Sequence, residues 1–185
     1  MNPVNRKRAA LVLIAALFAA PFLAAWLLDA SGWRPTGSRN FGDLVTPPQE
    51  LAGAHITLAD GSALRWNEPS RTWTLFALAG PDCAARCRER IDELRRVRLT
   101  LNQNAYRVRV VVVGAALDAA ALRAMAPVQL ATDANGALAA SLPRDPDQLA
   151  AALADPDGRL VLRYAPGYDG SQLRKDLGRL IREGF

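Results

Sequence analysis

Residues 73–87 read WTLFALAGPDCAARC and combine an apolar run, a Gly-Pro pair and two cysteines. The first seven, Trp73 to Ala79, form a continuous apolar run, which is typical of a strand buried on both faces. Gly80-Pro81 ends that run. A charged segment with apolar residues at helical spacing follows, from Cys83 to about Leu101. The stretch therefore predicts a buried strand that leads into a helix, with two cysteines near the junction.

The residues on either side predict an α/β domain. Val108 to Val113 is almost entirely β-branched, which indicates a second strand. Leu149 to Ala154 has helix propensity, but the turn at 155–158 (DPDG) demands an extended arm on each side, so we predict a strand there. Strands alternating with helices imply a central sheet covered by helices. The other expected elements are short strands at 55–58, 63–66, 128–131 and 159–164, and helices at 118–125 (capped by Asp118), 135–142 and 170–182.

The N-terminal part of the chain predicts a membrane anchor. Residues 9–28 carry no charge, and their number is about what a helix needs to cross the hydrocarbon core. The basic cluster Arg6 to Arg8 should stay in the cytoplasm and place the bulk of the chain on the far side, with Trp26 and Trp33 at the outer interface. A cleaved signal peptide is the alternative, but its apolar region is usually shorter, and no convincing cleavage site lies near residues 29–31. In both cases the domain reaches an oxidising compartment, where disulfides persist.

The sequence thus divides into a cytoplasmic tail at 1–8, a transmembrane anchor at 9–28, a Gly/Pro/Ser/Thr-rich linker at 29–49 and one domain at 50–185. The formal net charge is +5. Outside the basic cluster, 20 Lys and Arg residues (23 minus 3) face 18 Asp and Glu residues, and the two signs are interleaved. This pattern predicts a solvated mixed-charge surface and argues against a nucleic-acid partner.

The chain contains two cysteines, Cys83 and Cys87. At the start of a helix, free backbone N–H groups and the helix dipole would stabilise a thiolate, and Arg86, Arg88 and Arg90 add positive charge nearby. Asp82 would oppose this or cap the helix. A spacing of four puts both sulfurs on the same side of the first turn, so the pair could close a disulfide or present two thiolates to one Cu(I) ion. A structural disulfide over so short a loop would stabilise little, so we predict a functional pair. Zinc is disfavoured, because only His55 could join as a third strong ligand.

At this point the chain resembles the thioredoxin superfamily, and most closely its Sco/SenC branch of membrane-anchored, copper-binding assembly factors for cytochrome c oxidase. The resemblance implies a thioredoxin-like fold, with a central mixed sheet flanked by helices, behind an N-terminal transmembrane helix. It also matches Cys83 and Cys87 to the family's copper-binding, redox-active cysteines. The segments that carry the resemblance are ITLADG at 56–61, GPDCAARC at 80–87, DPDGRLVLRY at 155–164 and LRKDLGRL at 173–180, together with the anchor.

The chain departs from the family at one position. The family completes its copper site with a histidine shortly before the late hairpin; here that place falls near Asp147, and no histidine follows His55. A carboxylate such as Asp145 or Asp147 is a poor, hard ligand for Cu(I). The Cys2His site of the family therefore cannot be built from this chain alone. His55 lies on the other side of the motif, and we expect it to be an ordinary surface or strand histidine.

Three functions follow from the resemblance. The first is a cytochrome c oxidase assembly factor with copper as cofactor, Cys83 and Cys87 as ligands, and an oxidase subunit or another assembly factor as partner. The second is a thiol–disulfide oxidoreductase, acting on a copper-site disulfide or more generally, in which Cys83 attacks and Cys87 resolves the mixed disulfide. The third is a non-catalytic scaffold. All three place the protein in the inner (plasma) membrane as a single-pass protein, with a cytoplasmic N-terminus and a periplasmic C-terminal domain.

Overall fold

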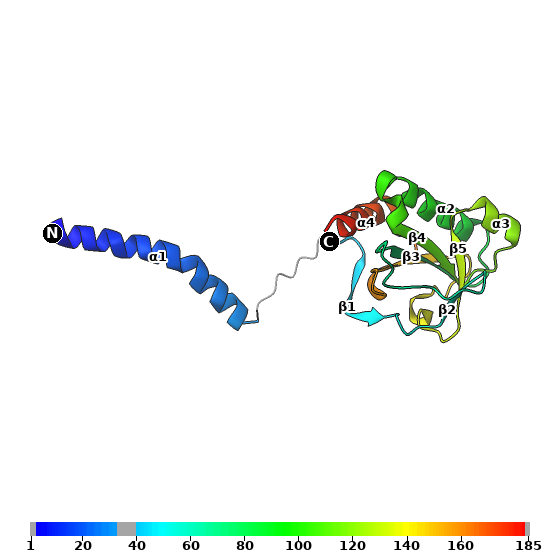
Figure 1. Cartoon of the computed structure of the whole chain (residues 1–185), viewed down its shortest axis with the longest axis horizontal. Coiled ribbons are helices and arrows are strands. Elements are labelled where there is room, and N and C mark those ends of the chain that lie inside the picture. Colours follow the sequence, from blue (N-terminus) through cyan, green and yellow to red (C-terminus); the bar gives the residue numbers. More distant parts are fainter. Residues whose placement is uncertain (1–2, 33–39, 184–185) are drawn as a thin grey trace. The chain divides into compact units, whose positions relative to one another are not determined.

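The computed structural model describes residues 3–32 and 40–183, and the chain forms two compact units, 1–39 and 40–185 (Figure 1). The first unit contains helix α1, Pro3–Ala30, with Pro21 in its interior. The stretch Arg8–Ala30 is long and apolar enough to cross a membrane, and none of it is buried inside the protein. A proline is tolerated in such a helix. The helix thus extends the predicted span of 9–28 at both ends, while Trp33 lies outside the described residues.

The second unit is built on a seven-stranded mixed sheet with the order β1-β7-β6-β3-β4-β5-β2. The β3–β4 and β4–β5 pairs are parallel, and the remaining pairs are antiparallel. Because β3 is the central strand, it is buried along its whole length, as its apolar run predicted. The strands are β1 (Asp43–Glu50), β2 (Ile56–Leu58), β3 (Trp73–Ala79), β4 (Val108–Val113), β5 (Gln129–Asp133), β6 (Leu149–Ala154) and β7 (Arg159–Tyr164).

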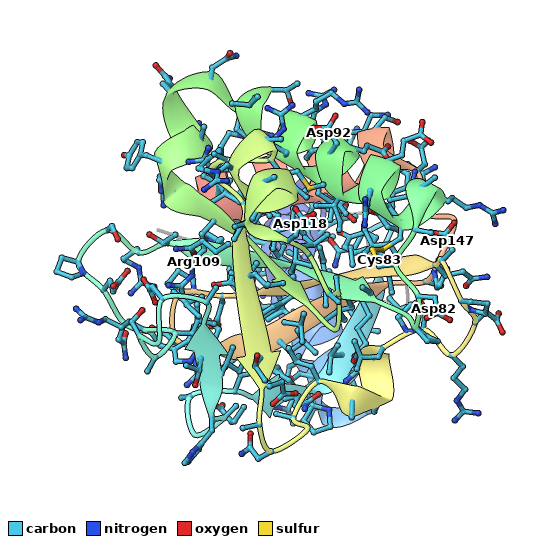
Figure 2. The ribbon with its side chains drawn as sticks, turned by 90° about the vertical axis from the view of Figure 1, so that its right-hand side faces the viewer. Asp82, Cys83, Asp92, Arg109, Asp118 and Asp147 are labelled. Carbon is cyan, nitrogen blue, oxygen red and sulfur yellow. A yellow bond between two sulfur atoms is a disulfide. The ribbon has the colours of Figure 1, made fainter. Side chains whose placement is uncertain are left out.

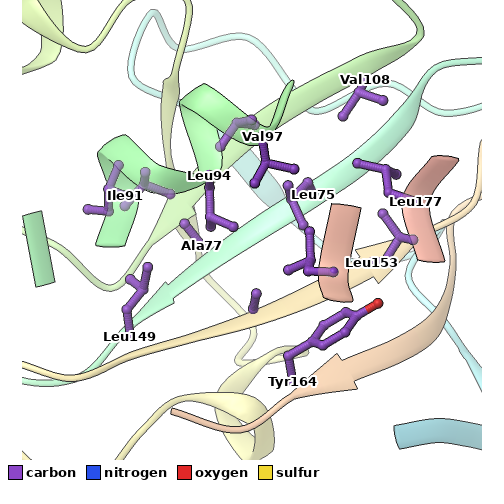
Figure 3. Packing of buried hydrophobic residues seen from close by; sticks show 14 of the residues in the cluster. Leu75, Ala77, Ile91, Leu94, Val97, Val108, Leu149, Leu153, Tyr164 and Leu177 are labelled. Atoms are coloured by element: carbon purple, nitrogen blue, oxygen red, sulfur yellow. The ribbon is translucent and has the colours of Figure 1, made fainter. Parts of the chain in front are cut away.

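Two helices pack on one face of this sheet (Figure 3). Ile91 and Leu94 of α2 and Leu177 of α4 meet Leu75 and Leu153 of the sheet in one buried cluster. The opposite face is covered by loops and short elements, whose buried side chains include Leu51, Leu64 and Leu138. The helices are α2 (Ala85–Leu99), α3 (Ala119–Ala124) and α4 (Gly170–Glu183), with 3-10 turns η1 (Asn102–Arg107) and η2 (Ala139–Ser141).

Most of the predicted elements form. The 149–154 segment is a strand in spite of its helix propensity, because both of its neighbours, β3 and β7, pair with it. The Asp118 carboxylate accepts a hydrogen bond from the Ala121 N–H and caps α3, as predicted. Two predictions were too generous: the strand at 63–66 shrinks to a single bridge between Thr57 and Ala63, and the helix at 135–142 to the turn η2.

Strand β1 forms inside the range 29–49 that we predicted to be a linker. The prolines Pro47 and Pro48 pointed to a linker, because a proline cannot donate to a β-ladder. In the structure β1 is an edge strand that pairs with β7, and its register is broken between Leu44 and Gln49. The two prolines lie in that interruption, where the ladder does not need their hydrogen bonds.

Candidate functional site

The two cysteines lie where the central strand gives way to α2 (Figure 2). Cys83 belongs to the connection that precedes the helix, and Cys87 lies in its first turn. Their sulfur atoms are joined in a disulfide, with the Cα atoms 5.1 Å apart. Cys83 is partly exposed, whereas Cys87 is completely buried and belongs to the core cluster. A partner molecule can therefore reach the Cys83 sulfur much more readily than the Cys87 sulfur.

A second loop, residues 143–148, lies directly against this junction. The Gly80 N–H donates to the Gln148 carbonyl (3.0 Å), and the Asp147 N–H donates to the Pro81 carbonyl (3.0 Å). A Cβ atom on Gly80 would lie 2.5 Å from the Asp145 carbonyl oxygen, so this position requires a glycine. The close approach holds a loop about 60 residues away in sequence against the start of α2.

The Asp147 carboxylate caps α2. It accepts hydrogen bonds from the backbone N–H groups of Ala84 (2.9 Å), Cys87 (2.9 Å) and Arg86 (3.2 Å). These bonds, the one from Cys87 first, hold the pKa of Asp147 below its ordinary value of 3.8. Asp82, which we considered as the cap, does not serve as one: the N-cap position is Ala84, and α2 begins two residues after Cys83 rather than at it.

This arrangement changes the electrostatics that we inferred from the sequence. The N–H groups at the start of α2 were expected to stabilise a Cys83 thiolate, but three of them are already bonded to a carboxylate. A fixed anion at the helix N-terminus offsets the positive end of the helix dipole. It also disfavours a second anion close by. A thiolate at Cys83 is therefore less stabilised than it would be at an uncapped helix start.

The residues present do not fit a three-ligand copper site. In the part of the chain that the structure describes, no group of three or more His, Cys, Asp or Glu residues could hold a metal ion. Asp147 lies where the resemblance to the Sco/SenC family would place a histidine, but its carboxylate is bonded to backbone N–H groups and is a hard ligand. His55 is exposed and precedes β2 at the far edge of the sheet, as expected of a surface histidine. This site could therefore offer Cu(I) two ligands, the sulfur atoms of Cys83 and Cys87.

A cleft of about 340 Å³ adjoins Asp147 and the first turns of α2. Arg86, which is exposed, and Arg90 both line the cleft. The Arg90 guanidinium lies over the Tyr168 ring and donates hydrogen bonds to the Glu93 carboxylate and the Tyr168 carbonyl. The sequence indicated Arg90 as a positive charge near the cysteines but gave no sign of its contact with Tyr168, because nothing in their spacing links α2 to the loop after β7. The residues that line the cleft are Arg86, Arg90, Asp147, Gln148, Leu149, Pro166 and Gly167.

The fold and the disulfide at the end of the central strand define a thioredoxin-like α/β protein with an N-terminal apolar helix. The family model described as "Transmembrane-like, thioredoxin-like, C-terminal domain" matches residues 73–183, and the chain belongs to this family. No curated protein is close enough in sequence to count as a match.

Solved structures share the fold at low sequence identity. Copper-bound ScoI from Arabidopsis thaliana is 14% identical with a TM-score of 0.52, over 77% of this chain and 98% of that one. A putative protein disulfide isomerase from Bacteroides thetaiotaomicron is 17% identical with a TM-score of 0.52, over 78% and 96%. BsSco, described as a member of the Sco family of cytochrome c oxidase assembly proteins, is 15% identical with a TM-score of 0.50, over 80% and 99%. These likenesses show the fold and do not choose between the functions of those proteins.

Proposed function

We propose that this protein is a membrane-anchored thiol–disulfide oxidoreductase that reduces a disulfide of a partner protein on the non-cytoplasmic side of the membrane. The observation that carries the proposal is the Asp147 carboxylate, bonded to the N–H groups around Cys83 and Cys87. An anion at this place disfavours the thiolate form and so favours the disulfide over the reduced pair. A pair whose reduced form is less stabilised gives up its electrons more readily, which suits a reductant.

The exposures of the two sulfurs assign their roles. In the reduced protein the Cys83 thiolate attacks one sulfur of the partner's disulfide, forms a mixed disulfide and releases the partner's first thiolate. The Cys87 thiol, held beside it, then loses its proton and attacks the Cys83 sulfur. This step closes the Cys83–Cys87 disulfide seen in the structure and releases the second thiolate. The partner gains two electrons and two protons, and a dithiol protein must reduce the Cys83–Cys87 disulfide before the next cycle.

The partner that we propose is a copper-binding cysteine pair of a cytochrome c oxidase subunit or of another assembly factor. The resemblance of the motifs to the Sco/SenC family supports this choice, and the fold shared with ScoI and BsSco is consistent with it. Such a pair must be reduced before it can bind copper, because the ligand is the thiolate. Delivery of copper itself is the rival function, since two thiolates can hold Cu(I). A second rival function is that of a general thiol–disulfide oxidoreductase that does not act on this partner.

Trapping of the mixed disulfide tests the proposal. The full chain, expressed in its membrane with Cys87→Ser, should accumulate a mixed disulfide with its partner, because the resolving thiol is absent. The matched variant Cys83→Ser should trap none. Circular dichroism of both variants checks that the buried Cys87 position tolerates serine. Trapping by Cys83→Ser alone, or by neither folded variant, would overturn the assignment of roles.

Copper binding separates the proposal from its rival. The reduced full chain is mixed with Cu(I) and a competing chelator, and bound copper is counted with and without Cys83→Ser. We expect copper to pass to the chelator, because the site lacks a third soft ligand. One equivalent of copper retained by the wild-type chain and lost in Cys83→Ser would favour copper delivery instead.

A further inference from the structure

A basic surface lies at the end of α2 opposite to the disulfide. It surrounds a cleft of about 420 Å³ between the second half of α4 and the segment 100–104 that follows α2. No acidic side chain lines this cleft among the described residues; Asp176 on the same helix is fully buried and pairs with Arg179 (3.9 Å), which leaves Arg174, Lys175 and Arg182 as the exposed cations. We call this surface the α4 patch, and its defining residues are Phe41, Arg174, Lys175, Arg179 and Arg182.

The α4 patch also exposes one large aromatic side chain, that of Phe41. Phe41 is 50% exposed and lies in the patch, with the Lys175 ammonium 5.6 Å from its ring centre. Leu99 (49% exposed) and Tyr106 (68% exposed) adjoin the 100–104 segment in sequence. An exposed aromatic side chain beside a cluster of cations is typical of surfaces that lie on anionic lipid.

The connection to α1 restricts where this patch can move. Phe41 is eleven residues from Ala30, the last residue of α1 (41 minus 30), and a chain of that length spans at most about 40 Å. With α1 in the membrane, Phe41 stays within about 40 Å of the end of the anchor. A short tether of this kind keeps the effective concentration of the surface high, so a weak attraction suffices for docking.

We infer that the α4 patch docks on anionic lipid headgroups of the membrane that holds α1. The inference rests on the membrane anchorage within the proposed function and is independent of the chemistry at Cys83. Docking of the α4 patch would also orient the disulfide relative to the lipid. Gly170 at the start of α4 packs against Glu93 in the middle of α2, and the later part of α4 lines the cleft with residues that follow α2, so the two helices run in the same direction. The 15 residues of α2 span about 22 Å, and docking at one end holds the disulfide at the other end away from the lipid.

Acylation of Lys175 tests this inference in the full chain. The chain has two lysines, Lys7 and Lys175, so mass spectrometry can follow Lys175 alone. The protein is placed in nanodiscs of phosphatidylcholine, with or without phosphatidylglycerol, and the rate of modification is compared. We expect Lys175 to react about fivefold more slowly in the anionic discs, which is the effect of about one basic residue's interaction with such a surface. The protection should disappear at high salt.

Two variants and inorganic phosphate serve as controls for the protection of Lys175 from acylation. The double variant Arg174→Gln/Arg182→Gln keeps Lys175 and should remove most of its protection. The matched control Arg123→Gln, on α3, should leave the protection unchanged. Equal rates in both lipids would overturn the inference. Equal protection by inorganic phosphate in neutral discs would also overturn it, because the patch would then be an anion site. Loss of disulfide exchange at Cys83 with protection intact would contradict the proposed function and leave this inference standing.

Discussion

Two aspartates organise opposite parts of this domain in the same way. Asp147 accepts hydrogen bonds from three backbone N–H groups at the start of α2. Asp176 accepts bonds from the N–H groups of Phe41 (2.8 Å) and Gly42 (3.1 Å) and from the Tyr164 hydroxyl (3.0 Å). Asp176 is fully buried, whereas Asp147 is partly exposed. A carboxylate that accepts several backbone N–H bonds thus ties elements of the fold together at a buried position, and in our proposal it adjusts the redox chemistry of the cysteines at a partly exposed one.

We expect the largest loss of stability from substitution of Asp176, the buried aspartate. Asp176→Ala leaves two N–H groups and a hydroxyl buried without their acceptor, and we expect a loss of about 3 kcal/mol in the free energy of unfolding. Chemical denaturation followed by near-ultraviolet circular dichroism measures it. The control Asp176→Asn keeps one acceptor oxygen and should lose less. A loss below about 1 kcal/mol in the alanine variant would mean that Asp176 does not hold the start of β1 to α4.

A smaller loss is expected at the loop contact that places Asp147. Gly80→Ala puts a methyl group 2.5 Å from the Asp145 carbonyl oxygen and must push the 143–148 loop away from the junction. We expect a cost of about 1–3 kcal/mol, as for other overpacked sites, and weaker capping of α2. Gly53→Ala is the matched control, because nothing lies within 4 Å of its added methyl group. Equal stability of the two variants would show that the loop adjusts without strain.

The exposed aspartate should affect redox chemistry more than folding. Asp147→Asn removes the charge and keeps an acceptor for the N–H groups of α2, so a Cys83 thiolate becomes more stable. We expect the reduction potential of the pair to rise by about 20 mV, which corresponds to the upper range of helix-dipole effects. The reduction potential is measured by equilibrating the protein with glutathione and counting the free thiols by alkylation. The matched substitution Asp176→Asn should leave the potential unchanged, and a lower potential for Asp147→Asn would contradict the electrostatic account.

The smallest expected effect is a pH dependence. The pKa of Asp147 is lowered in the folded protein by its hydrogen bonds, the one from the Cys87 N–H above all. Its contribution to stability is therefore complete above the ordinary value of 3.8 and is lost as the pH falls through the lower, folded pKa. Denaturation at neutral and at acid pH should show a larger acid-induced loss in the wild-type chain than in Asp147→Asn. The same loss in both would mean that the cap does not depend on the charge.

Sequence patterns predicted the elements of this fold whose cause is local. The apolar run 73–79, the β-branched run 108–113 and the turn at 155–158 each determine their own conformation, and all three form as expected. Strand β1 was not predictable in this way, because its pairing with β7 comes from residues more than 100 positions away.

The two cysteines could be predicted as the site, but their electrostatic environment could not. The sequence drew attention to the region of Asp147 only through the missing histidine, and the three N–H groups that it binds lie about 60 residues earlier. Asp176, by contrast, stands at a position that the sequence pattern marks as buried. It stands three residues after Leu173 and next to Leu177, on the apolar face of α4. A carboxylate at such a position needs a buried partner.

The reduction potential of the Cys83–Cys87 pair in the full chain decides whether this pair acts as a reductant. The protein is equilibrated with mixtures of reduced and oxidised dithiothreitol, and the fraction of free thiols is counted by alkylation. We expect a reduction potential below about −240 mV, in the range of pairs that reduce other proteins. A value near −120 mV, about that of a strong disulfide donor, would contradict it, because the reduced pair would then be the stabilised form.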